Sequence, residues 1–422
     1  MALDLAALNA GIAMRHSRAG LARARRRLRG DVRCGAAPTD FDPFAPAALA
    51  DPYPFYRRLH EGPAVHHHRG RALWILSGYD AVRAAARAHD ELSSAESVAR
   101  YRARLPMMLT TDRPEHSRLR QLVARDFTRA RLDAQAPLIE RLAVAAIDEL
   151  LAEGGGDWVK RLAEPLPVAV IAGMLGVPST DLGRFRRWSD ELVEGLAVTP
   201  GPGAARASLG VFRASIRLRS YFFEQATASE RPEGLLAALL AGMEEGRLSE
   251  DEVFWFCLML LVAGNETTSN LLGTLVLTLG RQPELYDRLR AEPELIPAAV
   301  EEGLRHTSPI QGLYRSARRE YRVGAARIPA GGRVLLLFGA ANRDPRHYPD
   351  PDRFDLDRNP TDHVAFGSGI HFCLGAHLAR LEAAIVLREL RRRVERIEVA
   401  NTPEWRRNPS LRGLSHLPLR LS

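Results

Sequence analysis

Apolar residues recur at helical spacing along most of the chain after residue 41, and glycine and proline mark the breaks between segments. Apolar runs typical of strands occur at two places, residues 67–76 and residues 333–338. Strand and helix patterns do not alternate as they do in doubly wound folds. The pattern therefore predicts a mainly α protein with small β-sheets, and residues 199–203, rich in glycine and proline, are expected to form a mobile loop.

The longest helix is predicted to begin after Ser249 and to run to about Gly280. Ser249 and Glu252 form the S-x-x-E capping pattern, in which each side chain bonds a backbone N–H of the other residue. No proline interrupts the following residues, and a helix of about 30 residues is about 45 Å long. Apolar positions surround it, so we expect it to be buried. A polar run from Asn265 to Asn270 lies in its middle, and buried polar groups need partners.

Residues 1–39 are predicted to form an extension ahead of the folded body, with a linker over residues 30–40. The basic cluster in residues 23–29 is not followed by the continuous apolar core of a secretory signal. We favour a solvated tail; a membrane-surface helix and an organelle transit peptide are the alternatives. The longest apolar run, residues 254–263, is too short to cross a bilayer, so no transmembrane anchor is expected.

The composition narrows the class of protein further. The chain has 422 residues, of which 46% are hydrophobic and 26% charged, values typical of a globular enzyme and not of disordered, collagenous or coiled-coil chains. Its formal charge is +8, but all of its 59 basic residues except Lys160 are arginine, which indicates compositional bias, and no nucleic-acid-binding motif accompanies them. Three cysteines, an odd and sparse number, argue against a disulfide framework and fit a reducing compartment.

A glycine-rich segment around one cysteine carries the most specific signal. It runs from Phe366 to Gly375 with the sequence Phe-Gly-Ser-Gly-Ile-His-Phe-Cys-Leu-Gly, and strongly helical residues follow it. Glycines let the backbone approach another group closely. Cys373 precedes a helix N-terminus, where backbone N–H groups favour a thiolate, and a thiolate there is suited to ligating a metal or a haem iron. The plain alternative is a small buried side chain in a turn.

This segment resembles the haem-binding loop of the cytochromes P-450, whose pattern is F-G-x-G-x-H-x-C-x-G. The resemblance implies the cytochrome P-450 fold, with a long central helix over the haem, a small β-region, and residues 40–422 forming a single haem domain. It implies haem b (iron protoporphyrin IX) as cofactor and Cys373 as the thiolate ligand of the iron, whose electron donation favours O–O cleavage. Other loop residues that it assigns to the cofactor are Phe366, Gly367, His371 and Gly375.

The segment Ala263-Gly-Asn-Glu-Thr-Thr268 in the long helix is similar to the acid–alcohol pair of that family. The resemblance makes Glu266 the acid and Thr267 the alcohol of a proton relay, and it places Ala263 and Gly264 beside the haem. A hydroxyl backed by a carboxylate can carry protons from water, and Gly264 is expected to let the helix open locally. Without the cysteine loop, the same residues could be a satisfied polar patch in a core helix.

Glu302-Gly-Leu-Arg305 places an acid and a base on one helix face, which by itself is an ordinary ion pair. In the family this E-x-x-R pair joins an arginine from a later loop. Arg353, in Pro351-Asp-Arg-Phe354, matches that third member. The resemblance therefore predicts a structural triad of Glu302, Arg305 and Arg353 that braces the cysteine loop.

His116 and Arg120 also share a helix face, which by itself could be a solvated surface. In the family these positions contact the haem propionates, and Arg315 and His371 match further propionate partners. Arginine suits this role because its guanidinium can bond both oxygens of a carboxylate. The motifs follow one another in the family's order over residues 40–420, which strengthens each of them.

The resemblance implies a monooxygenase that inserts one atom of O2 into a hydrophobic small molecule. Pocket residues expected from it are Met108, Leu260, Ala263, Ile310, Gln311 and Leu313, with Gln311 as a hydrogen-bonding handle. No G-x-G-x-x-G follows a strand, so no fused flavin or nicotinamide site is expected. An external ferredoxin and ferredoxin reductase are therefore implied, and we expect a cytoplasmic monomer with no nucleic-acid partner.

Two other functions are compatible with these motifs. A peroxide-driven enzyme would have less need of Glu266 and Thr267, and a haem protein that only binds or senses a ligand would have no use for a proton relay. The tract His66-His67-His68 is similar to a metal-binding sequence, but it adjoins a predicted strand and is interpreted as surface.

Overall fold

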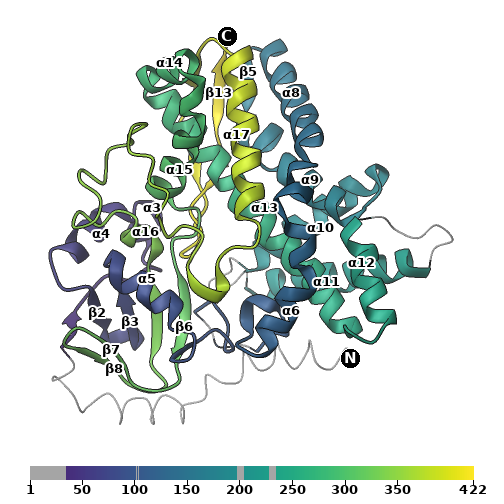
Figure 1. The fold of residues 1–422 in the computed structure, drawn as a ribbon. Helices are drawn as coiled ribbons and strands as arrows, with labels where there is room; N and C mark the ends of the chain where they lie inside the picture. The colour runs from purple at the N-terminus through teal and green to yellow at the C-terminus, as the bar shows by residue number, and fades with distance from the viewer. Residues whose placement is uncertain (1–34, 101, 103, 197–203, 228–233) are drawn as a thin grey trace. The chain divides into compact units, whose positions relative to one another are not determined.

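The computed structural model describes residues 35–422 apart from 101, 103, 197–203 and 228–233. These residues form two compact units, and Figure 1 lets the reader follow their elements along the chain. The first unit holds residues 35–120, 310–351 and 364–372; the second holds residues 121–309, 352–363 and 373–422. The predicted extension, residues 1–39, lies almost wholly outside the described residues, as do the predicted loop 199–203 and Cys34.

The first unit is built on a six-stranded sheet in the order β1-β2-β3-β9-β6-β4. Strand β3 pairs parallel with β9 and antiparallel with β2, and β6 pairs antiparallel with β9. A separate hairpin, β7–β8, and four helices complete the unit, while α6 (Glu115–Ala124) begins in it. The bounds are β1 Ala37–Pro38, β2 Val65–His68, β3 Leu73–Leu76, β4 Leu92–Ser93, β6 Leu313–Ala317, β7 Tyr321–Val323, β8 Ala326–Ile328, β9 Arg333–Leu336, α3 Pro46–Ala50, α4 Tyr53–His60, α5 Tyr79–Arg87 and α16 Phe338–Ala341.

The two predicted strands of this unit are present in altered form. Residues 67–76 were expected to be one strand, but they are a hairpin, because Arg69–Arg71 forms a 3₁₀ turn and Ala72 adopts a left-handed conformation with φ 48°. Charged and glycine residues at this turn separate the apolar β3 from β2. The strand predicted at 333–338 ends at Leu336, since α16 begins at Phe338.

The second unit is mainly helical and carries two small sheets, β10-β13-β5 and β11-β12. Its central element is α13, which packs against α9, α15 and α17. The bounds are α7 Arg129–Asp133, α8 Ala136–Ala152, α9 Pro165–Leu175, α10 Leu182–Leu196, α11 Ala204–Thr227, α12 Gly234–Glu244, α13 Glu250–Arg281, α14 Pro283–Ala291, α15 Ile296–Thr307, α17 Ala376–Arg393, β5 Gly155–Asp157, β10 Ile397–Val399, β11 Glu404–Trp405, β12 Leu414–His416 and β13 Pro418–Leu421.

Helix α13 matches the long helix predicted from the sequence. Ser249 is its N-cap and forms the reciprocal capping box with Glu252. Most of its 32 residues are buried, as the all-round apolar pattern required. Two of its buried polar side chains are bonded to the helix itself: Ser269 donates to the Asn265 carbonyl at 2.9 Å and Thr274 to the Asn270 carbonyl at 2.7 Å. These bonds offset part of the desolvation cost of the polar run, but Nδ2 of Asn270 is buried without a hydrogen-bond partner.

Candidate active site

A short accessible stretch interrupts the burial of α13 in the second unit. Val262, Gly264 and Thr267 are half-buried and Ala263 is exposed, although the helix is buried at Leu260–Leu261 before them and at residues 268–277 after them. The Thr267 hydroxyl donates to the Ala263 carbonyl over 2.7 Å. The stretch therefore presents a small hydrophobic surface and one hydroxyl in the middle of a core helix.

Gly264 lies at a close contact between α13 and α9, where a larger residue would displace the end of the Ile171 side chain. A Cβ at this position would lie 2.8 Å from Cδ1 of Ile171 on α9, closer than real side chains approach. We expected Gly264 to let the helix open locally, but α13 is a continuous α-helix through this residue. The close approach of α9 to α13 supplies the physical reason for the glycine.

Glu266 lies within the same turn and is 8% exposed. Burial raises the pKa of its carboxyl to about 7; nearby Arg406 opposes this shift and nearby Glu164 adds to it. Glu164 itself accepts from Lys160 Nζ at 2.9 Å and is paired with Arg406. Within the described residues, Glu266 makes no hydrogen bond or ion pair. A buried carboxyl with a pKa near neutrality can take up and release a proton at physiological pH.

Cys373 lies three residues ahead of α17, as the sequence predicted. It is half-buried and belongs to no disulfide. Gly375 is the N-cap of α17 and has no side chain to cap the helix, and a Cβ there would meet no atom within 4 Å. Cys373 thus precedes a helix N-terminus, whose first N–H groups have no partner within the helix. The second described cysteine, Cys257, is fully buried, and burial raises the pKa of its thiol well above the usual range.

The glycines of the cysteine loop adopt conformations that other residues avoid. Gly367 has φ +70° and Gly369 has φ +77°. A Cβ at Gly369 would come within 3.0 Å of the Ala86 carbonyl on α5, so this glycine also permits close packing within the first unit. Arg87 Nε donates to Ser368 Oγ at 2.8 Å and holds the loop to the same helix. Phe366 contacts Phe372 with ring centroids 6.3 Å apart.

The first unit brings the four predicted propionate partners to one place. The rings of His116 and His371 lie 4.3 Å apart, and Arg120 Nη1 donates to the Ile370 carbonyl at 3.2 Å. Arg315, on β6, is 4% exposed and donates to the Tyr314 carbonyl at 2.9 Å. The structure therefore places His116, Arg120 and His371 side by side, with Arg315 close enough to act on the charge of His371.

This cluster has an excess of positive charge and two unsatisfied ring nitrogens. Burial, reinforced by Arg315, lowers the pKa of His371 to about 2, and burial reinforced by Arg120 lowers that of His116 to about 4. Burial lowers the pKa of Arg315 to about 10. Nδ1 of His116 and Nε2 of His371 are buried without a hydrogen-bond partner. Donors of this kind fit carboxylates, which the propionates of a haem would supply.

The structural triad is present with a different third member. Arg305 donates to Glu302 through two bonds of 2.7 Å, and both side chains are fully buried. The arginine side chain that reaches Glu302 is Arg358, at 3.3 Å. Arg353 instead offers its carbonyl to Arg305 at 3.2 Å, while its own side chain is 63% exposed and pairs with Asp355. The prediction of Arg353 as the third charged member is therefore wrong. Arg358, five residues later in the chain, places its guanidinium beside Glu302 instead.

The predicted pocket residues are only partly accessible. Met108 and Leu260 are buried, and Ile310 and Leu313 are half-buried against the core of the first unit. Gln311 is 3% exposed, and its Oε1 accepts from the Tyr56 hydroxyl at 2.6 Å. Its amide also fills the space above Gly339. The prediction that Gln311 offers a hydrogen bond to a substrate is thus not matched by its position, since the oxygen already has a partner within the core.

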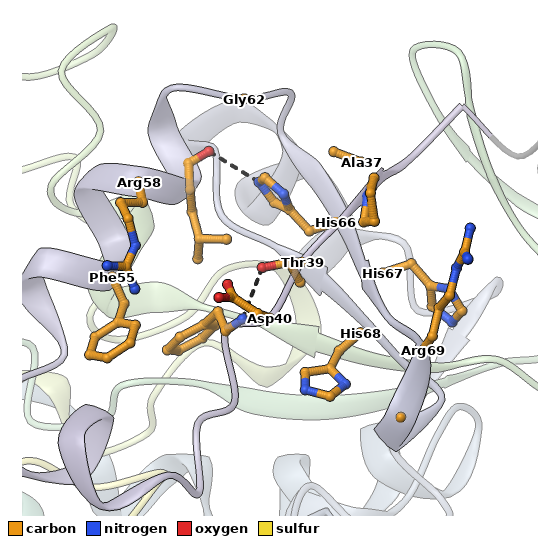
Figure 2. A pocket seen from close by; sticks show the side chains of 14 residues that line it. Ala37, Thr39, Asp40, Phe55, Arg58, Gly62, His66, His67, His68 and Arg69 are labelled. Atoms are coloured by element: carbon orange, nitrogen blue, oxygen red, sulfur yellow. Dashed lines mark hydrogen bonds between the residues drawn. The ribbon is translucent and has the colours of Figure 1, made fainter.

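A surface cavity of about 790 Å³ lies on the first unit beside β1 and β2 (Figure 2). The three consecutive histidines belong to its wall, but His66 is 4% exposed and bonds the Leu59 carbonyl at 3.1 Å, which corrects its interpretation as a surface residue. His67 stacks on Trp74 with ring centroids 4.4 Å apart. In the described part of the chain, no three His, Cys, Asp or Glu side chains gather closely enough to hold a metal ion.

Sequence reasoning missed three groups that surround the predicted residues. Arg358 reaches Glu302, the pair Glu164–Arg406 lies near Glu266, and Glu301 bonds Arg380. None of these belongs to a local motif, because the partners are between 56 and 242 residues apart. The available signal in the sequence for further buried ion pairs was the doublet Glu301-Glu302. These two adjacent acids lie on a helix that is buried on both faces.

Comparisons with known proteins agree with these features. A sequence model of the family "Cytochrome P450" matches residues 217–411. The β-dihydromenaquinone-9 omega-hydroxylase of Mycobacterium tuberculosis is 45% identical over 385 residues, covering 90% of this chain and 78% of that protein. The cytochrome P450 monooxygenase PikC of Streptomyces venezuelae is 38% identical, covering 88% of this chain and 91% of that protein.

The fold leads to the same family. The structure of cytochrome P450 CYP109Q5 from Chondromyces apiculatus superposes with a TM-score of 0.81 at 34% identity, covering 92% of this chain and 98% of that one. These matches identify the class of haem-thiolate oxidoreductases, for which a cysteine ahead of a helix supplies the ligand of the iron. The chain belongs to the cytochrome P450 family. It is a monooxygenase that uses a haem iron. In its described residues, every helix is too short or too polar to cross a membrane.

Proposed function

We propose that this protein is a ferredoxin-dependent haem b monooxygenase that hydroxylates the end of a long isoprenoid lipid chain. The observation that carries the proposal is the accessible stretch of α13, where an apolar surface, the Thr267 hydroxyl and the titratable Glu266 occur within one turn of an otherwise buried helix. Residues 40–422 are proposed to serve as one haem domain. The residues that support this function belong to both units.

Cys373 is proposed to ligate the haem iron. The thiol lies before a helix N-terminus, where a negative charge is stabilised, and Gly375 leaves open space beside it. Phe366 and Gly367 precede it in the same loop. In the first unit, His116, Arg120, Arg315 and His371 are proposed to bind the propionates. This assignment rests on the buried, partnerless nitrogens of the two histidines and on the buried guanidinium of Arg315.

When bound, the haem supplies the activation of O2. The overall reaction consumes one substrate C–H bond, one O2, two electrons and two protons, and it yields an alcohol and water. Glu266 is proposed to supply these protons, since its pKa of about 7 lets it accept one from solvent and pass it on. Thr267 is proposed to hold the proton acceptor in place through its hydroxyl, which its bond to the Ala263 carbonyl orients. Ala263 and Gly264 provide a flat surface beside it.

The electrons are proposed to come from a ferredoxin and its reductase. The formal charge of +8 favours the approach of an acidic partner at low ionic strength. A peroxide-driven reaction is the alternative, and the near-neutral Glu266 argues against it, because a peroxide already carries the protons that the relay would deliver.

The substrate is proposed to be an isoprenoid lipid because the Mycobacterium tuberculosis relative, at 45% identity, is named for omega-hydroxylation of β-dihydromenaquinone-9. The accessible apolar residues Val262 and Ala263 on α13 fit a hydrocarbon chain better than a polar scaffold. Among relatives with lower identity, PikC is named only as a monooxygenase, so it does not direct the choice of substrate.

Turnover assays test this function. The purified protein is supplied with a menaquinone of long isoprenoid chain, a ferredoxin, its reductase and a nicotinamide reductant. We expect a product heavier by one oxygen atom, with the label of ¹⁸O2, at the chain end. A menaquinone with a single isoprene unit is the matched control and should be a much poorer substrate. Equal oxidation of both would contradict the substrate proposal, and product formed only with hydrogen peroxide would favour the peroxide-driven alternative.

A further inference from the structure

Glu301 links two segments of the second unit that lie on either side of Cys373 in the sequence. It lies on α15 and is 7% exposed. Its carboxylate accepts from Nε of Arg380 at 2.6 Å and from Nη2 at 2.8 Å, the two-pronged geometry that guanidinium and carboxylate prefer. Nε2 of His363 lies 3.3 Å from its Oε2. Arg380 follows Cys373 by seven residues on α17, and His363 precedes it by ten.

The charge of Glu301 is secured by these contacts. Burial by itself would raise the pKa of the carboxyl, but the bonds from Arg380 and the close contact with His363 outweigh it and hold the pKa at about 2. The group is therefore ionised at neutral pH. Its ionised form is what draws the first turns of α17 and the segment ending at His363 towards α15.

Glu301 and its neighbour Glu302 contact different segments of the second unit. Glu302 is fully buried and bonds Arg305, Arg358 and the backbone N–H of Asp355, so it holds the segment 352–358. Glu301 faces α17, the helix that begins just after the cysteine. Successive residues on a helix point in directions about 100° apart, so two adjacent acids can contact two different elements.

We propose that Glu301 is a positioning residue, which acts through Arg380 and His363 to fix Cys373 as a thiolate ligand of the haem iron. This inference rests on the proposed role of Cys373. Glu301 does not touch the cofactor or the reacting atoms. Its contribution is to restrain the chain before and after the cysteine, so that the sulfur is held at one distance and orientation.

The same helix offers a matched control. Glu389 lies 16 residues after Cys373 on α17, its side chain is 3% exposed, and it pairs with Arg388, Arg392 and Arg393. Glu389→Gln therefore removes a buried, arginine-paired charge from the far end of the helix. Glu301→Gln removes one from the end nearest the cysteine. Both variants keep the shape of the side chain, so the difference between them isolates the position of the charge.

The experiment compares loss of thiolate ligation with loss of folding in urea. For the wild type and both variants of the holoprotein, the carbon monoxide difference spectrum of the reduced form reports the thiolate, and far-ultraviolet circular dichroism reports the helices. We expect Glu301→Gln to convert to the spectrum of thiol-ligated haem about tenfold faster than the wild type at urea concentrations where helicity is unchanged. Glu389→Gln should lose both signals together. Arg380→Lys, which keeps one charged contact, should fall between Glu301→Gln and the wild type.

Four outcomes would overturn the inference. Equal conversion rates in Glu301→Gln and Glu389→Gln would mean that the contact is a general brace of the fold. A Glu301→Gln variant that keeps its thiolate as the wild type does would remove the positioning role. If Glu301→Gln does not fold, the Arg380→Lys variant tests the proposal alone. Conversion to thiol-ligated haem at the wild-type rate in Arg380→Lys would then contradict it. Absence of the thiolate signature in the wild type itself would refute the ligand assignment of Cys373, and this inference would fall with it.

Discussion

Two buried acids of the second unit, Glu302 and Glu266, have opposite surroundings. Glu302 is fully buried and bonds Arg305, Arg358 and a backbone N–H. Glu266 is almost as buried, yet in the described residues it has no bonded partner, and the ions nearest to it, Glu164 and Arg406, are paired with each other. Similar burial thus accompanies two different electrostatic arrangements.

The difference in bonding gives the two buried carboxyl groups different roles. A buried carboxylate with a full set of donors is locked in its ionised form and transmits force between segments of chain. A buried carboxylate without donors is costly when ionised, so its pKa rises towards neutrality and its proton becomes exchangeable. The first arrangement serves structure, and the second serves proton transfer. The predictions below test whether the two acids differ in this way.

Glu302→Gln is expected to have the largest effect. It leaves the guanidinium groups of Arg305 and Arg358 buried beside a neutral amide, and removing one partner of a buried pair costs about 3–5 kcal/mol. The free energy of unfolding, measured by urea denaturation, should fall by that amount. A decrease below about 1 kcal/mol would show that the network contributes little.

Glu266→Gln is expected to lower turnover strongly while changing stability little. Its free energy of unfolding, measured below pH 4.5 where the wild-type carboxyl is neutral in both states, should change by less than about 1 kcal/mol, because in the described residues the side chain has no bonded partner to lose. Turnover should fall by about 10²–10⁴-fold, the contribution of a positioned proton donor. Steady-state product formation with saturating reductant measures this. Wild-type turnover in this variant would mean that protons reach the site by another route.

Arg358→Ala and Arg353→Ala form a matched pair that tests the corrected triad. Arg358 is 11% exposed in its side chain and contacts the buried Glu302, so its removal should cost about 2–3 kcal/mol. Arg353 is 63% exposed and pairs at the surface, so its removal should cost less than about 1 kcal/mol. Thermal or urea denaturation of both proteins measures the difference. Equal costs would restore Arg353 as an equal member of the network.

The pH dependence of stability should carry the signature of Glu266. Its pKa is about 7 in the folded protein and 4.5 at its ordinary value. Between these values the folded state holds a proton that the unfolded state has released, so stability is full below pH 4.5 and declines as the pH rises through 7. The decline should amount to at most about 3 kcal/mol. Glu266→Gln should lack this component, and parallel curves for the two proteins would contradict the raised pKa.

Much of the fold could be predicted because it depends on local patterns. The capping box, the apolar periodicity and the missing proline defined α13 nearly to the residue, from Glu250 to Arg281. The hairpin at residues 65–76 was missed because residues 67–76 were interpreted as one strand, although Gly70 and its charged neighbours mark a turn within them. Short turns of this kind depend on pairing with other strands, which one stretch of sequence does not reveal.

The candidate site was predictable where a motif fixes spacing and unpredictable where partners come from distant segments. Cys373, Glu266 and Thr267 occur within recognisable motifs, and the structure places them in the elements expected. Arg358 was missed in favour of Arg353 because both directly follow an aspartate, and only the folded path of the loop decides which side chain reaches Glu302. The hydrogen bond that Gln311 accepts from Tyr56, 255 residues away, could not be inferred from either segment alone.

The central claim is that Cys373 binds the haem iron as a thiolate. The most direct test is the carbon monoxide difference spectrum of the reduced protein and of Cys373→Ala. We expect the strongly red-shifted Soret band of thiolate-ligated haem in the wild type and its complete loss in the variant. The same red-shifted band in Cys373→Ala, or its absence from a folded, haem-loaded wild type, would contradict the account.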